Sequence, residues 1–308
     1  MRNYGGSRWP GSPANSALSP NQPKLVVVGN ACLDVTYHLD RLPKPGETLI
    51  AQKVVTDLGG KGLNQAIAAQ RAGADVHLIA TIGNDAAGER IRTSLQAEGM
   101  ADHGLVVHEG MSDDSLLLLD PEGENVIVSN TGQAQSLQPD EIAFAGTDLV
   151  LLQGNLSEET TRHTITMARQ AGVRIAINPS PFQAWFRSLP DIDIIIANQV
   201  EADALSVSGS LLNVVTLGRK GCRLKSGSDP ETFIPAPRVH AIAAGGAGDV
   251  FAGTFIAEWL ASGEAERAAR LAVRAASDKT TRHGILSAFP SRSAIETFRR
   301  EEPPSPSN

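Results

Sequence analysis

A run of small residues at 245–253, Gly-Gly-Ala-Gly-Asp-Val-Phe-Ala-Gly, leads directly into a candidate helix whose apolar positions recur every four residues from Phe251. Small residues permit a tight turn, and the first amides of a helix lack partners within it. We therefore expect the amides of 247–249 to face an anion. Asp249 stands in that first turn, where it could accept a proton from a hydroxyl group, so the run suits phosphoryl transfer. The alternative is an ordinary Gly-rich helix start in which Asp249 only complements the helix dipole.

A second Gly-rich run, Gly-Gly-Lys-Gly-Leu-Asn-Gln-Ala at 59–66, also enters a candidate helix. The cation of Lys61 and the amide of Asn64 fall within one turn, which suits hydrogen bonding to a polyol. The glycines would let a ligand approach the backbone closely. Alternatively they only cap a connection while Lys61 is solvated. Neither run has the glycine spacing of a P-loop or of a dinucleotide fingerprint, so we exclude those sites.

A third polar pair follows an apolar run that ends at Asn198. Asn198 is placed to cap the next helix, and Glu201 falls in the first turn of that helix. The alternative to a functional role is a plain helix cap.

Short apolar runs alternate with helical patterns along most of the chain, which predicts an α/β fold with a doubly wound, mostly parallel sheet flanked by helices. The expected strands are Leu25–Val28, Val76–Ile82, Leu149–Leu152, Val173–Ile177, Ile192–Ile196 and Val214–Leu217. The expected helices are Gly62–Ala72, Ala87–Glu98 and Glu158–Ala171.

Two segments interrupt this alternation with β-type residues and turn signals, at about 35–58 and 105–131. We expect them to form a small β lid inserted into a main domain of residues 24–300; alternatively they extend the main sheet. Residues 1–23 and 301–308 are rich in Gly, Ser, Pro or Glu, and we predict disordered tails there.

The composition limits the class of partner. The net charge of −7 argues against nucleic acid, and no apolar run approaches the roughly 20 residues of a membrane span. The 308 residues include two cysteines, too few for a disulfide framework or a zinc site. With no secretory signal visible, we expect a cytoplasmic protein that acts on a small molecule.

The order of the motifs resembles one family. Leu-Pro-Lys-Pro-Gly-Glu-Thr at 42–48 with the run at 59–66 is similar to the N-terminal signature of the PfkB carbohydrate kinases, and Gly-Ala-Gly-Asp at 246–249 is similar to their C-terminal signature. The resemblance covers about 25–290 and is to the ribokinase branch. It implies the ribokinase-like fold, ATP, Mg²⁺ and transfer of a phosphoryl group to a primary hydroxyl of a sugar.

The resemblance also implies roles for individual residues. Asp249 matches the catalytic base, and Gly246, Ala247 and Gly248 match the anion hole; Asp34, Gly59, Gly60, Lys61 and Asn64 match sugar contacts; Asn198, Thr216 and Gly218 match the nucleotide site, with Glu201 acting on Mg²⁺.

The chain departs from the ribokinase pattern at three places. Ala243, Ala244 and Gly245 stand where Asp-Thr-Thr is usual, so the resemblance does not extend to activation by a monovalent cation such as K⁺. Cys32 replaces a ribose-binding Asn, and Asn155 replaces a Glu that contacts the sugar. The substrate therefore stays open between ribose, a related pentose or sugar derivative, and a nucleoside such as pseudouridine. A non-catalytic sugar sensor is the alternative from another class, and pairing of lid edges predicts a homodimer.

Overall fold

The computed structural model describes residues 22–302 except 123, 145, 191, 206–210 and 228. Its main body is a nine-stranded sheet in the order β13-β12-β11-β10-β9-β8-β1-β4-β5. The strands are β1 (Lys24–Val28), β4 (Asp75–Gly83), β5 (Leu105–His108), β8 (Leu149–Gln153), β9 (Arg174–Asn178), β10 (Ile194–Asn198), β11 (Leu212–Thr216), β12 (Gly221–Ser226) and β13 (Thr232–Pro235). From β11 to β5 the neighbours are parallel, and β12 and β13 add an antiparallel edge. The predicted doubly wound, mostly parallel sheet is thus confirmed.

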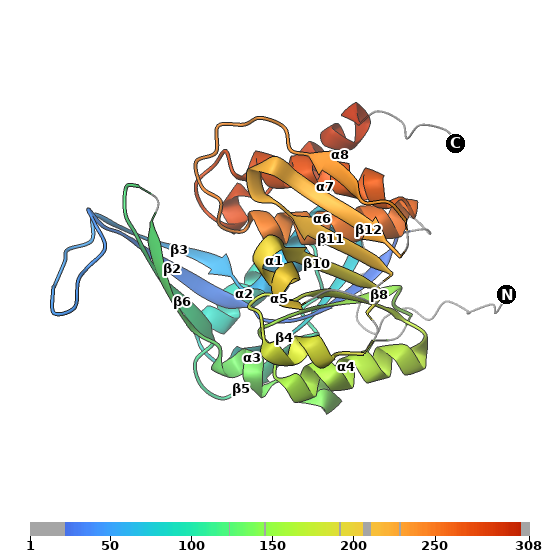
Figure 1. Cartoon of the computed structure of the whole chain (residues 1–308). Helices are drawn as coiled ribbons and strands as arrows, with labels where there is room; N and C mark the ends of the chain where they lie inside the picture. The colour runs from blue at the N-terminus through green and yellow to red at the C-terminus, as the bar shows by residue number, and fades with distance from the viewer. Residues whose placement is uncertain are drawn as a thin grey trace.

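Helices cover both faces of this sheet (Figure 1). They are α1 (Lys61–Arg71), α2 (Ala86–Ala97), α3 (Gly132–Ser136), α4 (Glu158–Ala171), α5 (Gln199–Leu205), α6 (Ala247–Ser262), α7 (Ala265–Lys279) and α8 (Arg292–Glu301). Short 3-10 turns are η1 (Pro139–Glu141), η2 (Ala184–Ser188), η3 (Gly218–Lys220) and η4 (Leu286–Ala288). The expected helices all form, with ends within one residue of the expected ones.

The central strand shows why its sequence is apolar throughout. In β1, Leu25 and Val27 enter the core formed with α1, α6 and α7, whereas Val26 and Val28 enter the core against α4. Successive side chains of a strand point to opposite faces, so a strand covered on both sides has no polar face. Because the side chains on both faces of β1 are buried, the strand is held firmly, and so is the position of the residues that follow Val28.

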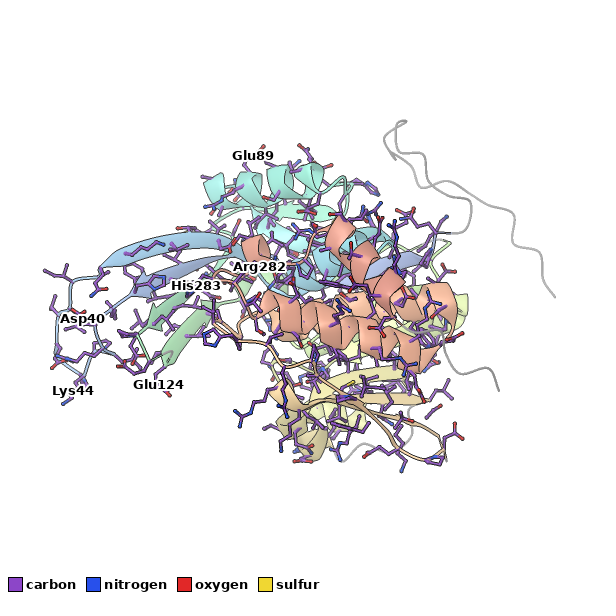
Figure 2. The ribbon with its side chains drawn as sticks, turned by 90° about the horizontal axis from the view of Figure 1, so that it is seen from above. Asp40, Lys44, Glu89, Glu124, Arg282 and His283 are labelled. Carbon is purple, nitrogen blue, oxygen red and sulfur yellow. The ribbon has the colours of Figure 1, made fainter. Side chains whose placement is uncertain are left out.

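A second, four-stranded sheet projects from the main body in the order β3-β2-β6-β7 (Figure 1). It consists of β2 (Cys32–His38), β3 (Lys53–Gly59), β6 (Asp113–Leu119) and β7 (Asn125–Asn130). Asp40 and Lys44 mark the tip of the β2–β3 connection, far from the helices of the main body (Figure 2). We call this sheet the lid sheet; closure over a ligand stays a prediction.

One boundary of the lid prediction was wrong. The segment expected at 105–131 begins with β5, and β5 pairs in parallel with β4 of the main sheet. Its sequence Leu-Val-Val-His has the same β-type composition as the lid strands. Composition alone does not say which sheet a strand joins, so the lid part of this segment begins only at Asp113.

The ends of the chain are partly outside the described residues. Residues 1–21 of the tail predicted at 1–23 are not described, and neither are 303–308. Helix α8 extends to Glu301, which pairs with Arg274, so the disordered tail predicted at 301–308 was wrong at its first residue. Within the described part of the chain, no helix has the length and hydropathy needed to cross a bilayer.

Candidate active site

The predicted site residues gather where parallel strands end. Asn155 is the second residue after β8, and Asn198 and Thr216 are the last residues of β10 and β11; Gly29 and Asn30, which the sequence analysis did not assign to the site, follow β1 at the same edge. β1 lies between β8 and β4, so the order of the strands changes direction at β1, with β4 and β5 added on one side and β8 to β13 on the other. In open α/β sheets, ligands bind outside the carboxyl ends of strands at such a switch in direction. The topology therefore places the candidate site at this edge.

Helix α6 carries Asp249 in its first turn, where the side chain is buried and 6% exposed. Gly246 is the residue before the helix and has φ +77°, a left-handed conformation that strains other residues. A Cβ at Gly248 would meet nothing within 4 Å, so the space in front of the helix start is open. This is the tight turn that the small-residue run predicts.

The expectation of three unpaired amides at 247–249 was partly wrong. The amide of Ala247 donates to the carbonyl oxygen of Ala244 at 3.1 Å, because the turn closes before the helix begins. Within the described residues, the amides of Gly248 and Asp249 have no such partner. The amides left free at this helix start are therefore those of Gly248 and Asp249, whereas the amide of Ala247 closes the turn.

Helix α1 brings three side chains to Asp249. Asn64 Nδ2 donates to Asp249 Oδ2 at 3.2 Å, and Gln65 Nε2 donates to Asp249 Oδ1 at 3.0 Å. The ammonium of Lys61 lies 3.8 Å from Oδ1. The two Gly-rich helix starts thus meet at one carboxylate, with Asn64 and Asp249 separated by 185 residues in the sequence.

Close packing of α1 on α6 fixes this meeting. Gly253, one turn beyond Asp249, faces the backbone of α1, and a Cβ there would overlap the carbonyl oxygen of Gln65. At the start of α1, Gly62 instead allows close approach to the segment after β1, since a Cβ there would lie 2.6 Å from the amide nitrogen of Asn30. Glycine lets backbones approach where a side chain would hold them apart.

Asp34 joins the site from the lid sheet. It lies in β2 and is buried, and it leaves no space for a side chain at Gly59, where a Cβ would overlap its carboxylate. Burial raises the pKa of Asp34 to about 6, with smaller contributions from the charges of Asp57 and Asp249, while hydrogen bonds from Cys32 and Ser115 oppose the shift. The charge of Asp249 therefore disfavours the ionised form of Asp34.

Gln65 is a site residue that the sequence analysis did not single out. Its side chain is completely buried; besides Asp249, its Nε2 donates to Asn178 Oδ1 at 2.9 Å, and its Oε1 accepts from Gln153 Nε2 at 3.0 Å. Asn178 in turn donates to the carbonyl oxygen of Ile196 at 2.7 Å. The network ties the ends of β8, β9 and β10 to Asp249. The polar side chains of Gln153 and Asn178, each at the end of an apolar strand, were the signal that could have revealed it.

Asn198 and Glu201 cap the start of α5 reciprocally. The amide of Asn198 donates to Glu201 Oε2 at 2.9 Å, and the amide of Glu201 donates to Asn198 Oδ1 at 2.9 Å. Asn198 pairs in register with Thr216, and Gly218 follows in a turn with φ +56° and open space where a Cβ would stand. These four residues form a separate group at the same sheet edge, and among the described residues none of them is hydrogen bonded to Asp249.

Asn64 Oδ1 and Asn155 Oδ1, the buried amide oxygens of two predicted site residues, lack a partner within the described chain, as does Gln153 Oε1 in the Gln65 network. Buried polar atoms are nearly always hydrogen bonded, so such an atom calls for an explanation. A ligand hydroxyl would supply the missing donor at either asparagine oxygen.

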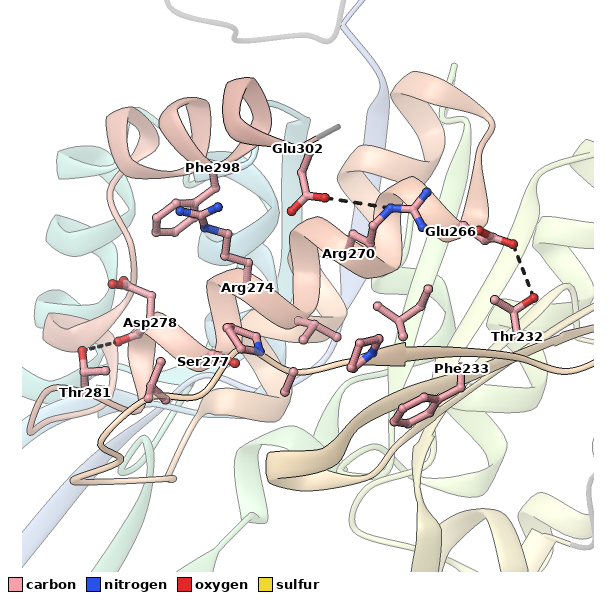
Figure 3. A pocket seen from close by; sticks show the side chains of 16 residues that line it. Thr232, Phe233, Glu266, Arg270, Arg274, Ser277, Asp278, Thr281, Phe298 and Glu302 are labelled. Carbon is pink, nitrogen blue, oxygen red and sulfur yellow. Dashed lines mark hydrogen bonds and ion pairs between the residues drawn. The ribbon is translucent and has the colours of Figure 1, made fainter. Parts of the chain in front are cut away.

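A cavity of about 790 Å³ lies elsewhere, between β13 with its following loop and helices α7 and α8 (Figure 3). Arg270 approaches Glu302 at 3.9 Å in it, and Arg274 stacks on the ring of Phe298 at 4.7 Å. None of the predicted site residues lines this cavity. Its cations are already engaged by carboxylates or an aromatic ring, so it offers no free charge to a ligand.

Comparison with known proteins decides what kind of site this is. The model of the pfkB family of carbohydrate kinases matches residues 22–292. The chain belongs to this family. It is 29% identical over 303 residues to the deoxyribokinase of Salmonella typhi, covering 89% of this chain and 97% of that protein. It is 30% identical over 289 residues to the ribokinase of Bacillus subtilis (strain 168), covering 88% and 98%.

A solved structure confirms the fold. The ribokinase of Cryptococcus neoformans var. grubii serotype A in complex with ADP superposes with a TM-score of 0.81 at 24% identity, covering 90% of this chain and 99% of that one. The protein is an ATP-dependent carbohydrate kinase of the ribokinase-like branch. The alternative of a non-catalytic sugar sensor is thereby set aside.

Proposed function

We propose that this kinase phosphorylates the primary hydroxyl group of a pentose or a pentose derivative, with Asp249 as the general base. The observation that carries the proposal is the buried Asp249 carboxylate, which two side-chain amides of α1 hold beside the unpartnered amides of Gly248 and Asp249 itself. A base and anion donors in one helix turn are what phosphoryl transfer requires.

In the proposed step, the substrate oxygen forms a bond to the γ-phosphorus of ATP while the bond from that phosphorus to the β–γ bridging oxygen breaks. The hydroxyl proton moves to Asp249, and ADP leaves with the electron pair of the broken bond. The amides at the start of α6 stabilise the negative charge on the transferred group, aided by the positive end of the helix dipole. Lys61 adds a cation beside the reacting oxygen.

Glu201 suits a role in holding Mg²⁺. The described residues contain no cluster of three or more side chains that could bind a metal by themselves. Mg²⁺ in kinases is usually held by one or two carboxylates, waters and the phosphates of the nucleotide, so a single carboxylate fits. Glu201 uses Oε2 in the cap of α5, which leaves Oε1 for a metal-bound water. The metal would neutralise charge on the ATP phosphates, with Asn198, Thr216 and Gly218 lining the nucleotide site.

The sugar would lie between Asp34 and Asp249. Asp34 and the free oxygens of Asn64 and Asn155 offer acceptors for secondary hydroxyls, and Gly59 and Gly60 leave room for them. Cys32 offers a thiol that already interacts with Asp34 at 3.5 Å. The site therefore offers fewer strong contacts to hydroxyl groups than a ribose site does. This suits 2-deoxyribose, in keeping with the deoxyribokinase relative, and a nucleoside is the second candidate.

The test is ADP release by the purified protein with ATP and Mg²⁺, across ribose, 2-deoxyribose, other pentoses, hexoses and nucleosides. We expect a pentose to give the highest kcat/KM, and a clear preference for a nucleoside would favour the second candidate. Asp249→Asn should lower kcat by about 10²–10⁴-fold with little change in the KM for ATP. Asp140→Asn, at an exposed carboxylate of η1, is the matched control. A near-wild-type rate in Asp249→Asn contradicts the assignment of the base.

We also propose a homodimer through the lid sheet. Its edge strands are β3 and β7, and Val54, Ile127 and Val128 on them are 51%, 53% and 62% exposed. An open edge with exposed β-branched residues is a template for pairing with a second copy. Analytical ultracentrifugation tests this, and a monomer across the accessible concentration range contradicts it.

A further inference from the structure

Lys279, the last residue of α7, is fully buried with 0% exposure. It is the one Lys or Arg side chain in the buried class within the described part of the chain. Lysine is almost never buried completely unless it is paired, because removing an ammonium from water is costly. A buried cation at this position therefore needs a partner that offsets the free-energy cost of its desolvation.

The ammonium of Lys279 donates to the carbonyl oxygen of Ala243 at 3.0 Å. Burial lowers the pKa of Lys279 to about 8, the charge of Arg282 lowers it further, and the carboxylate of Asp57 opposes the shift. A group with that pKa is mostly protonated at neutral pH. Lys279 thus supplies a fixed positive charge to the backbone at Ala243.

The contact between Lys279 and Ala243 lies just before the turn that leads into α6. The amides of Ile242 and Ala243 both donate to the carbonyl oxygen of Thr280, at 2.7 and 3.1 Å. Three residues beyond Ala243 is Gly246, which begins the turn into α6. The segment after α7 and the segment before α6 are therefore joined by Lys279 and Thr280 immediately upstream of Asp249.

The same junction reaches the lid sheet. Asp57 of β3 accepts hydrogen bonds from the amide of Ile285 at 3.0 Å and from Ser287 Oγ at 3.2 Å. Arg282 and His283, in the connection between Thr280 and Ile285, lie at the base of the lid strands in Figure 2. The segment that follows Lys279 thus contacts both the residues before α6 and the lid sheet.

The residues at this junction do not fit a free monovalent cation. The family-type ligand expected at position 243 is a carboxylate, and Ala243 has none. The carbonyl of this same residue accepts from the ammonium of Lys279. Because an ammonium ion binds to oxygen atoms as K⁺ does and carries the same charge, it can serve in place of the ion.

We propose that the ammonium of Lys279 replaces the activating monovalent cation of ribokinase-like enzymes, as a tethered cation that holds the 242–246 turn in its anion-binding form. The protein then works without K⁺. The inference rests on the proposed kinase function where the reaction rate is measured, but not where K⁺ binding is measured by the melting temperature. Lys279 is a positioning residue, since it acts through the turn and not on the substrate.

The test compares rates in KCl and in choline chloride at matched ionic strength, with the acceptor that the substrate panel identifies. The wild-type rate should agree within about twofold between the salts, whereas loss of a charge-assisted hydrogen bond in Lys279→Met should lower kcat by about tenfold or more. Lys225→Met, at an exposed lysine of β12, is the matched control. Stimulation of the wild type by K⁺ of about fivefold or more overturns the inference, as does an unchanged rate in Lys279→Met.

A double variant, Ala243→Asp with Lys279→Ala, should instead gain a K⁺ site. Its melting temperature should rise in KCl relative to choline chloride, and its rate should become K⁺-dependent, while the wild type shows neither effect. A purely structural role for Lys279 would not produce this gain. A folded double variant indifferent to K⁺, or a K⁺-specific rise in the wild-type melting temperature, overturns the inference even if no acceptor is phosphorylated. Silence of the wild type across the acceptor panel counts against the kinase proposal alone.

Discussion

Replacing Gln65 with leucine removes one of the two amide donors that hold the Asp249 carboxylate, with little change in side-chain size. Gln65 Nε2 lies 3.0 Å from Asp249 Oδ1 and is completely buried. The hydrogen bond is therefore unscreened, and no water can replace it without opening the contact between α1 and α6. We expect Asp249 to keep only its bond from Asn64, at 3.2 Å, and to lose its fixed orientation.

The size of the effect follows from the kind of bond lost. A hydrogen bond to a charged group contributes about 1.5–3 kcal/mol, which corresponds to about a 10- to 150-fold change in rate. The variant also leaves the buried amides of Asn178 and Gln153 without one partner each, at about 1–3 kcal/mol of folding stability per group. Activity and stability should therefore both fall.

Steady-state kinetics and urea denaturation measure the two effects separately. We expect kcat to fall about 10- to 150-fold while the KM for ATP stays near the wild-type value, because among the described residues Gln65 makes no hydrogen bond to Asn198, Thr216 or Gly218. Gln96→Leu is the matched control, since Gln96 Nε2 donates to the carboxylate of Asp102 at 3.1 Å on the exposed face of α2. A folded Gln65→Leu protein with an unchanged kcat would refute the view that this network positions Asp249.

Two further predictions concern Asp34 and Gly253. Burial raises the pKa of Asp34 to about 6, so on acidification its carboxyl group is protonated at a higher pH than that of an exposed aspartate. The KM of the wild type for the sugar should therefore rise about five- to tenfold between pH 7 and pH 5. The variant Asp34→Asn should show a high KM that does not change with pH. A pH-independent KM in the wild type would contradict a role for the ionised form. Gly253→Ala should lower the free energy of unfolding in urea by about 1–3 kcal/mol or more, because the new methyl overlaps the Gln65 carbonyl of the facing helix. Gly132→Ala, where a Cβ meets its nearest neighbour at 3.6 Å, should change it by no more than about 0.5 kcal/mol.

Several features of the candidate site could be predicted because their signals are local. A Gly-rich turn followed by helical spacing specifies a helix start within a few residues, and both starts, at Gly60 and Gly246, are observed where the sequence places them. Apolar runs bounded by Gly, Asn or Pro likewise predict buried strands, since covering both faces of a sheet requires such runs. The order of these elements along the chain then limits the fold to a doubly wound sheet.

Features that depend on partners far apart in the chain could not be predicted in this way. β5 has the composition of a lid strand but pairs with β4, because strand pairing depends on the arrangement of both sheets. The amide of Ala247 donates a hydrogen bond to the carbonyl oxygen of Ala244, and residue types do not specify this detail of the turn. Gln65 stands in the second Gly-rich run without a visible role, and only the contact of α1 with α6 brings it to a carboxylate 184 residues away.

The sequence by itself determined the class of chemistry, because the donors and the base lie within single helix turns. The tertiary structure alone decided how those turns are held. A lysine at the end of a helix is typical of a solvated side chain that complements the helix dipole, and nothing in the residues around Lys279 says otherwise. Only the packing of α7 against the 242–246 turn buries its ammonium on Ala243, where this chain lacks the carboxylate of the family pattern. Burial and long-range pairing are properties of the folded chain, and they determine which charges act on the site.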